Sequence, residues 1–193
     1  MDRRLALRTI RHSFTGLLGL IPDALTNNEA SIADAASMIA GSLRQGHKVM
    51  FCGNGGSAAD AQHFAAELVG KFYLKRRALP ALALTTDTSI LSSIGNDISF
   101  DQVFSRQVEA LARKSDVLVC ISTSGRSTNV VAAARLARRT GVRVIALTGA
   151  NRRQLSPISD IVISVPSTDT PRVQEIHTLV GHILCQMVEA ELS

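Results

Sequence analysis

The segment VLVCISTSGRS spans residues 117–127 and changes from apolar to polar near its midpoint. Its first five residues are apolar throughout and have the length of a β-strand. A strand without alternating polar residues is typical of a sheet that is buried on both faces. The segment therefore predicts a buried strand, followed by a hydroxyl-rich turn that leads into a helix.

Four further apolar runs of strand length lie along the chain, at residues 49–52, 81–84, 142–147 and 161–165. The segments between them carry apolar residues at helical spacing, for example over 58–69, 103–111 and 130–137. Because strands alternate with helices, the sequence predicts an α/β fold: a doubly wound, five-stranded parallel sheet flanked by helices on both faces.

Helical patterns also occur at both ends of the chain. Two N-terminal helices are predicted at residues 3–18 and 29–44, and a last helix is predicted at 170–191. No repeat or linker divides the chain, so we expect one structural domain overall. Within it, residues 1–45 form a helical region that packs on the core and on neighbouring subunits, and residues 46–193 form the α/β domain. Self-association is expected because these terminal helices need a surface to pack on.

The net charge of the 193-residue chain is +5 and its pI is about 9.6, so the protein should attract anions such as phosphates or nucleic acid. Aromatic residues make up only 4%, which leaves few platforms for stacking single-stranded bases. Basic clusters at 71–77 and 135–139 leave direct nucleic-acid binding as one class of function, but neither belongs to a recognised reading motif. Nucleic acid is thus a disfavoured partner.

Cysteine usage and hydropathy indicate a cytoplasmic protein without a membrane span. Cys52, Cys120 and Cys185 are odd in number, lack CxxC spacing and lie in apolar runs, so we expect them to be reduced and buried. No apolar run approaches the roughly 20 residues that a membrane helix needs. The Arg-rich start and the apolar residues 14–21 are interpreted as an amphipathic helix rather than a signal peptide, because two glycines interrupt the apolar stretch.

The serine loop, STSGRS at residues 122–127, follows a strand and opens a helix. Helix N-termini favour anions, and ligands of open parallel sheets bind at the carboxyl edge of the strands. Because the loop lacks the lysine of a P-loop, it suits a sugar phosphate better than a nucleoside triphosphate. The alternative interpretation is that Ser127 is only a helix N-cap and that the remainder is a polar turn.

The glycine loop, GNGGS at residues 53–57, follows the first predicted strand and also opens a helix. Together with Ala58 it satisfies GxGxxA, the fingerprint of dinucleotide binding. That fingerprint expects an acidic residue about 20 positions on. The nearest candidate, Asp87, lies about 30 positions on, so nicotinamide binding is only the second hypothesis for this loop.

His63 and Glu67 are four residues apart on the helix that the glycine loop opens, so they share a face, about one turn from that loop. An imidazole and a carboxylate beside an anion site can transfer protons or hold a metal. The alternative is a solvated surface pair.

The last helix carries both His177 and His182 on the side opposite its apolar stripe, together with Gln174. Helical angles do not separate a functional histidine from a structural one here. Asn96 and Asp97 could bind sugar hydroxyls, or could simply belong to a turn.

Four motifs in this order closely resemble one family, the sedoheptulose 7-phosphate or phosphoheptose isomerases of the sugar isomerase (SIS) fold. They are CGNGGS at 52–57, DAQHFAAE at 60–67, ISTSGRS at 121–127 and VQEIH at 173–177, and the resemblance covers about residues 46–192. It implies a homotetramer with active sites between subunits. The implied reaction converts sedoheptulose 7-phosphate into D-glycero-D-manno-heptose 7-phosphate, the first step towards nucleotide-activated heptose, a lipopolysaccharide precursor.

The resemblance also implies roles for individual residues. The phosphate of the seven-carbon sugar would bind Ser122, Thr123, Ser124 and Ser127, and the remaining substrate contacts would come from Asn54, Gly55, Gly56, Glu67, Asn96, Asp97 and Gln174. One Zn²⁺ per subunit would be held by His63, Glu67, Gln174 and His182, and the catalytic acid/base pair would be Glu67 and His182. Arg126 receives no role.

The implied mechanism moves a proton through an enediol. Glu67 would remove a proton from C1 of the open-chain ketose and return it to C2, while His182 moves protons among the oxygens. We expect these two residues to meet across neighbouring chains. The alternative function is that of a non-catalytic SIS adaptor that binds the bacterial replication initiator, a relative that lacks Glu67 and His182.

Overall fold

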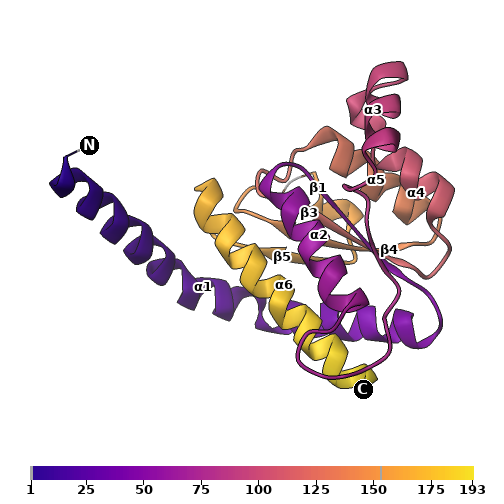
Figure 1. The fold of residues 1–193 in the computed structure, drawn as a ribbon, viewed down its shortest axis with the longest axis horizontal. Helices are drawn as coiled ribbons and strands as arrows, with labels where there is room; N and C mark the ends of the chain where they lie inside the picture. The colour runs from indigo at the N-terminus through magenta and orange to yellow at the C-terminus, as the bar shows by residue number, and fades with distance from the viewer. Residues whose placement is uncertain (1, 153) are drawn as a thin grey trace.

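The computed structural model describes residues 2–152 and 154–193, and its centre is one parallel sheet of five strands in the order β2-β1-β3-β4-β5 (Figure 1). The strands are β1 (Val49–Gly53), β2 (Ala81–Ala83), β3 (Val117–Ser122), β4 (Arg143–Thr148) and β5 (Ile161–Ser164). The predicted fold class is therefore confirmed, and each strand lies within a residue or two of its predicted bounds.

The order of the strands reverses between β1 and β3, which are paired so that Gly53 lies opposite Ile121. Ligands of open parallel sheets bind outside the carboxyl ends of the strands at such a reversal. The loops that leave β1 and β3 are the glycine loop and the serine loop. The topology thus puts both loops at the position where a ligand is expected.

Helices cover both faces of the sheet. They are α1 (Arg3–Arg44), α2 (Gly56–Val69), α3 (Thr88–Asp97), α4 (Ser105–Leu111), α5 (Thr128–Arg139) and α6 (Thr170–Leu192), with short 3-10 helices η1 (Phe100–Gln102) and η2 (Ser156–Ile158). Successive side chains of β3 point to opposite faces of the sheet and belong to two different hydrophobic cores. Val119 packs in the core with α1, α2 and α6, whereas Cys120 packs in the core with α4 and α5. The central strands β1 and β3 are buried at every position, as predicted, whereas the edge strands β2 and β5 are only partly buried.

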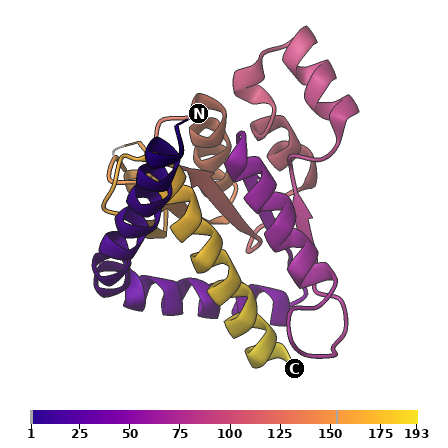
Figure 2. The ribbon, with the colours of Figure 1, turned by 60° about the vertical axis from the view of Figure 1, so that its left-hand side comes forward.

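The two predicted N-terminal helices are one helix, so that prediction was wrong. α1 runs through Pro22 and bends part-way along its length (Figure 2). A proline inside a helix removes a hydrogen bond and bends it without necessarily ending it. In the gap between the two predicted helices, the buried side chain of Asn28 donates to Ser164 O (3.0 Å) and accepts from Ser164 N (2.8 Å) on β5.

The first half of α1 projects from the body of the molecule (Figure 1). It exposes large apolar side chains, which are Leu5, Leu7, Ile10, Phe14 and Leu18. Within the described residues, no helix is long and apolar enough to cross a membrane. All three cysteines are buried thiols, as predicted.

Candidate active site

The glycine loop is joined directly to the start of α5. Gly55 has a φ of +56°, a conformation that side chains rarely adopt, and it turns the chain from β1 into α2. The amide of Asn54 donates to Asn129 Oδ1 (2.8 Å), and the amide of Asn129 donates back to Asn54 Oδ1 (3.0 Å). This reciprocal pair fixes the loop after β1 against the helix that follows the serine loop.

The hydroxyl groups of the serine loop face one another rather than the helix. Ser127 occupies the N-cap position of α5, but its side chain makes no capping hydrogen bond. Its Oγ instead lies 3.0 Å from Oγ of Ser122, which is also 3.5 Å from Oγ of Ser124. The N-cap alternative therefore does not account for this side chain. The first N–H groups of α5 have no partner within the helix and remain suited to an anion.

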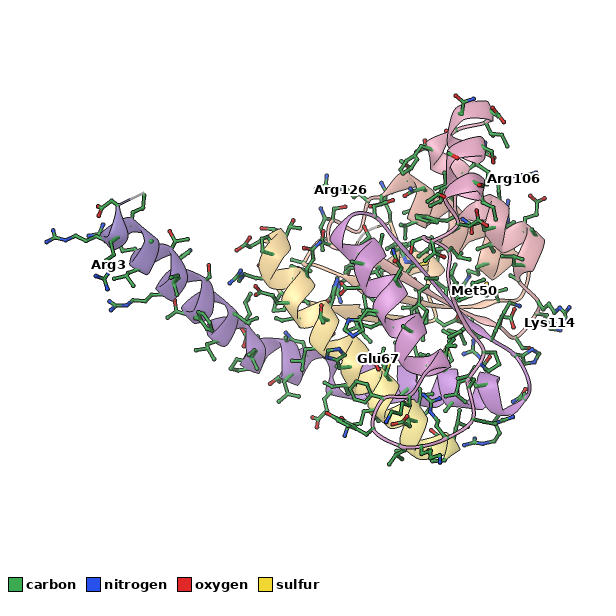
Figure 3. The ribbon with its side chains drawn as sticks, viewed as in Figure 1. Arg3, Met50, Glu67, Arg106, Lys114 and Arg126 are labelled. Carbon is green, nitrogen blue, oxygen red and sulfur yellow. The ribbon has the colours of Figure 1, made fainter. Side chains whose placement is uncertain are left out.

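The backbone of the serine loop is tightly constrained. Gly125 has a φ of +62°, and a Cβ on it would overlap the carbonyl of Asn151. Thr123 accepts a hydrogen bond from the backbone N–H of Gly149 (3.0 Å). Arg126 extends from the edge of the loop (Figure 3), and its backbone N–H donates to Ser124 Oγ (3.2 Å). The loop is thus a rigid, hydroxyl-lined turn held from two sides.

A second cluster lies where α2 packs beside α6. His63 Nε2 lies 3.2 Å from Glu67 Oε1 and 3.2 Å from His182 Nε2, and the two imidazole rings have centroids 4.9 Å apart. Glu67 lies on the lower part of α2, next to α6 (Figure 3). His63 thus links the predicted acid/base residues Glu67 and His182 within one chain, whereas we expected them to meet across neighbouring chains.

The other histidine of α6 has a different environment. His177 is fully buried, and its Nε2 lies 3.1 Å from the carbonyl oxygen of Thr148. Burial lowers the pKa of His177 to about 4, although the hydrogen bond to Thr148 opposes that shift. The imidazole is therefore neutral near pH 7 and belongs to the core, so the geometry separates the two histidines that helical angles alone left open.

The predicted distance between the His63 pair and the glycine loop was wrong. Because α2 begins at Gly56, inside the glycine loop, His63 is seven residues into the helix and Glu67 is eleven. At 1.5 Å per residue, these residues lie about 10 Å and about 16 Å along the helix axis from its first residue. The cluster is therefore two to three turns from the loop rather than one.

Gln174 lies with the glycine loop and not with the histidines. Its amide packs so closely on Gly56 that a Cβ there would overlap it. Gln174 and His182 are eight residues apart on α6, which corresponds to about 12 Å along the helix axis. In this structure, Gln174 is therefore separated from the histidine cluster and is not placed to share a ligand with it.

The spacing of the histidine cluster can be compared with that of a zinc site. Two ligands about 2.05 Å from a tetrahedral ion lie about 3.3 Å from each other. The separations of 3.2 Å from His63 to Glu67 and to His182 match this value. Nevertheless, no group of three or more His, Cys, Asp and Glu side chains in the described part of the chain is arranged to hold a metal. The residue types and pairwise distances suit zinc, but their arrangement in one chain does not complete a site.

Asn96 and Asp97 form the end of α3 rather than a turn, and both are exposed. The amide of Asn96 donates to Asp97 Oδ1 (2.7 Å). α3 stands apart from the α2–α6 surface in both views (Figures 1 and 2). Among the described residues, neither side chain is hydrogen-bonded to the glycine or serine loop.

Asp60 was not singled out from the sequence but lies beside the histidine cluster. Its carboxylate accepts a hydrogen bond from Thr178 Oγ1 (2.8 Å). Burial raises the pKa of Asp60, and this bond together with the nearby imidazoles of His63 and His182 opposes the rise. The spacing of residues 60, 63 and 67 places all three on one face of α2, and that spacing is a signal that could have identified Asp60.

Comparison with known proteins places this geometry in a family. A family model of the SIS domain matches residues 15–149. A phosphoheptose isomerase from Rhodospirillum rubrum is 56% identical over 162 residues, which cover 84% of this chain and 86% of the relative. This chain belongs to the phosphoheptose isomerase family of SIS-domain proteins. The predicted family and enzyme class are thereby confirmed.

Solved structures of the phosphoheptose isomerase family share the whole fold. GmhA from Neisseria gonorrhoeae matches with a TM-score of 0.90 at 43% identity, over 96% of this chain and 99% of that chain. A phosphoheptose isomerase from Francisella tularensis matches with a TM-score of 0.93 at 36% identity, over 96% and 98%. The α/β architecture, including the region of α1, is therefore that of the family.

Proposed function

We propose that this protein converts sedoheptulose 7-phosphate into D-glycero-D-manno-heptose 7-phosphate by proton transfer through an enediol. The observation that carries the proposal is the contact of His63 with both Glu67 and His182, 3.2 Å in each case. Linked through His63, the carboxylate of Glu67 and the imidazole of His182 provide a base and a proton shuttle, which are the two groups that an aldose-ketose isomerisation needs.

The phosphate group is assigned to the serine loop. The facing hydroxyls of Ser122, Ser124 and Ser127 and the N-terminus of α5 supply neutral donors and a favourable dipole for a dianion. The loop lies at the reversal of strand order, where open parallel sheets bind ligands. Asn54 and Gly56 of the glycine loop would contact the sugar alongside it.

In the proposed mechanism, Glu67 takes a proton from C1 of the open-chain ketose and delivers it to C2. His182 moves the proton between the oxygens on these two carbons, so that the charge that develops on the enediol is neutralised as it forms. His63 contacts both side chains and would keep them on the same face of the sugar.

The predicted zinc ion would be held by His63, Glu67 and His182, with Gln174 as the fourth ligand. When bound, such an ion supplies Lewis-acid stabilisation of an oxyanion. In this structure Gln174 packs on Gly56, about 12 Å along α6 from His182, so it does not complete the site where it lies. A Gln174 from a neighbouring copy would fit the predicted homotetramer with active sites between subunits.

A second observation supports assembly. The projecting half of α1 exposes a series of large apolar side chains, including Phe14 at 69% exposure. An apolar groove continues from it between α1 and α6, lined by residues such as Leu25, Ile176 and Leu179. Large apolar surfaces of this kind mark interfaces. We place the α1 region, residues 1–45, on the core of its own chain and on neighbouring copies.

The product of this reaction would enter nucleotide-activated heptose synthesis as its first intermediate. Free buried thiols suit a reducing compartment, and we place the protein in the cytoplasm.

The test is incubation of the purified protein with sedoheptulose 7-phosphate, with product identified by NMR. We expect conversion to the aldoheptose phosphate, a slower reaction after treatment with a chelator, and recovery on adding Zn²⁺. A protein that binds the replication initiator and leaves the sugar phosphate unchanged would instead be the non-catalytic adaptor.

A further inference from the structure

One arginine of the basic cluster at 71–77 is buried, while its basic neighbours are exposed. The side chain of Arg76 is only 3% exposed, whereas Lys71, Lys75 and Arg77 lie at the surface. A buried guanidinium is rare unless it is paired and hydrogen-bonded. Arg76 is therefore not part of a surface that could bind nucleic acid, and its burial needs another explanation.

The guanidinium of Arg76 binds the end of α2. Its Nη2 donates to the carbonyl oxygen of Glu67 (2.9 Å), and its Nη1 donates to the carbonyl oxygens of Leu68 (2.9 Å) and Arg77 (3.0 Å). The last carbonyls of a helix lack partners within it and favour a cation. Arg76 thus holds the backbone of Glu67, the proposed base, at the point where α2 ends.

The partner of Arg76 is Glu189, on α6. The two side chains form an ion pair, with Arg76 Nε 3.0 Å from Glu189 Oε1, and Glu189 is only 1% exposed. The Glu189 carboxylate also accepts backbone N–H bonds from Phe72 (2.9 Å), Tyr73 (2.6 Å) and Leu74 (2.8 Å). Burial disfavours the charged form, but the three N–H groups and Arg76 outweigh it and lower the pKa of Glu189.

The bond to Phe72 connects Glu189 to the other proposed catalytic residue. The ring of Phe72 packs on the imidazole of His182, with ring centroids 5.6 Å apart and an interplanar angle of 36°. The same carboxylate therefore holds Arg76, which holds Glu67, and the backbone of Phe72, which lies against His182. The two branches of this network end at the two residues of the proposed acid/base pair.

We infer that Arg76 and Glu189 are positioning residues, which set the separation of Glu67 and His182 for proton transfer. The inference rests on the proposed function, because it assigns these residues a role in that reaction. Neither residue touches the reacting atoms; each acts through a neighbour. A displacement of about 1 Å in a catalytic group can reduce a rate by about a hundredfold.

The first test replaces Arg76 by lysine, which keeps the charge but cannot bind Glu189 and both helix carbonyls at once. We expect kcat to fall by roughly tenfold to a hundredfold. KM should change by less than about threefold, because the serine loop that binds the phosphate is on different elements. The matched control is Arg77→Lys, one residue away and exposed, which should keep the wild-type kcat.

The second test approaches the pair from α6 and does not depend on turnover. Glu189→Gln and Phe72→Leu should shift and broaden the imidazole NMR signals of His182. The matched control is Glu191→Gln, on the same helix as Glu189. It removes only an exposed ion pair with Arg44 of α1, and it should leave the His182 signals unchanged. Phe72→Leu keeps the backbone N–H bond to Glu189, so it remains informative if Glu189→Gln does not fold.

The outcomes separate the two proposals. If Arg76→Lys is folded and has the kcat of the wild type, or if the His182 signals are the same in Phe72→Leu as in the wild type, the positioning role is wrong. If the wild type does not convert the sugar phosphate but the His182 signals respond as expected, the proposed function fails while the structural coupling stands.

Discussion

The buried His177 gives the protein a pH-dependent stability that can be calculated from the structure. Its pKa is lowered to about 4 by burial, from an ordinary value of 6.5. Between these two pH values the unfolded chain binds a proton that the folded chain does not bind. The free energy of unfolding should therefore decrease as the pH falls from above 6.5 to about 4.

The size of this effect follows from the pKa difference. A difference of about 2.5 pH units, at 1.36 kcal/mol each, corresponds to about 3 kcal/mol lost between pH 7 and pH 4. The replacement His177→Gln removes the titrating group, and its amide can still donate to the carbonyl of Thr148. We expect this variant to lack that part of the pH dependence, whatever its stability at pH 7.

The assay is urea denaturation at fixed protein concentration, at half-unit steps from pH 4 to pH 7.5. The difference in unfolding free energy between wild type and His177→Gln isolates the contribution of this imidazole from the other titrating groups. His12→Gln, at an exposed position of α1, is the control and should parallel the wild type. If wild type and His177→Gln lose stability in parallel, the imidazole is not kept neutral by burial and the reasoning is refuted.

Three further predictions concern the packing of glycines in helices, the serine loop and the buried carboxylate of Asp116. Gly181→Ala should lower the free energy of unfolding, measured by urea denaturation, by about 1–3 kcal/mol, because its Cβ would overlap the ring of Phe64. Gly19→Ala, with open space around it, should instead raise the free energy of unfolding by up to about 1 kcal/mol in the same assay. Gly125→Ala should raise KM for the sugar phosphate by about tenfold or more, with a smaller change in kcat, since a strained serine loop loses mainly binding energy; an unchanged KM would remove the phosphate from this loop. Asp116→Asn should cost about 1–3 kcal/mol at pH 7, because the buried carboxylate accepts charged and backbone donors that outweigh its burial and lower its pKa. The wild-type contribution of Asp116 is present above about pH 4 and disappears as the pH falls through the lowered pKa, so the two proteins should converge in urea midpoint under strongly acidic conditions.

The sheet was predictable because a strand that is buried on both faces is apolar at successive positions of the sequence. Runs such as residues 117–121 contain no polar residue that could mark a solvent-facing side, and the turns that follow them contain the polar residues of the site. The side-by-side placement of the glycine and serine loops then follows from the parallel order of β1 and β3.

The errors arose where a distant contact or a local cap decided the structure. α1 continues past Pro22 because Asn28 gains hydrogen bonds with β5, a strand that is far away in the sequence. α3 starts where the side chain of Asp87 accepts from Ile90 N (2.9 Å), and it continues through Asn96 and Asp97, for which a turn was the alternative interpretation. The helix propensity of neighbouring residues predicts neither the contact of Asn28 with β5 nor the strength of the Asp87 cap.

The candidate site was predictable in its residue types but less so in its arrangement. His63 and Glu67 share a helix, so their proximity follows from their spacing, whereas the contact with His182 depends on how α6 packs beside α2. The separation of Gln174 from His182 along α6 follows from the rise of a helix alone, whereas the packing of Gln174 on Gly56 depends on how α6 lies against α2. The burial of Arg76 could not be inferred, since its partner Glu189 is near the other end of the chain.

The proton-transfer assignment of Glu67 and His182 is tested most directly by the isomerisation rates of wild type, Glu67→Gln and His182→Ala, measured with sedoheptulose 7-phosphate at saturation. Circular dichroism would verify that the variants are folded. We expect both variants to lose activity by about a hundredfold or more, since each removes a general acid or base. A Glu67→Gln variant that turns over the sugar phosphate at the wild-type rate would contradict the proposed mechanism.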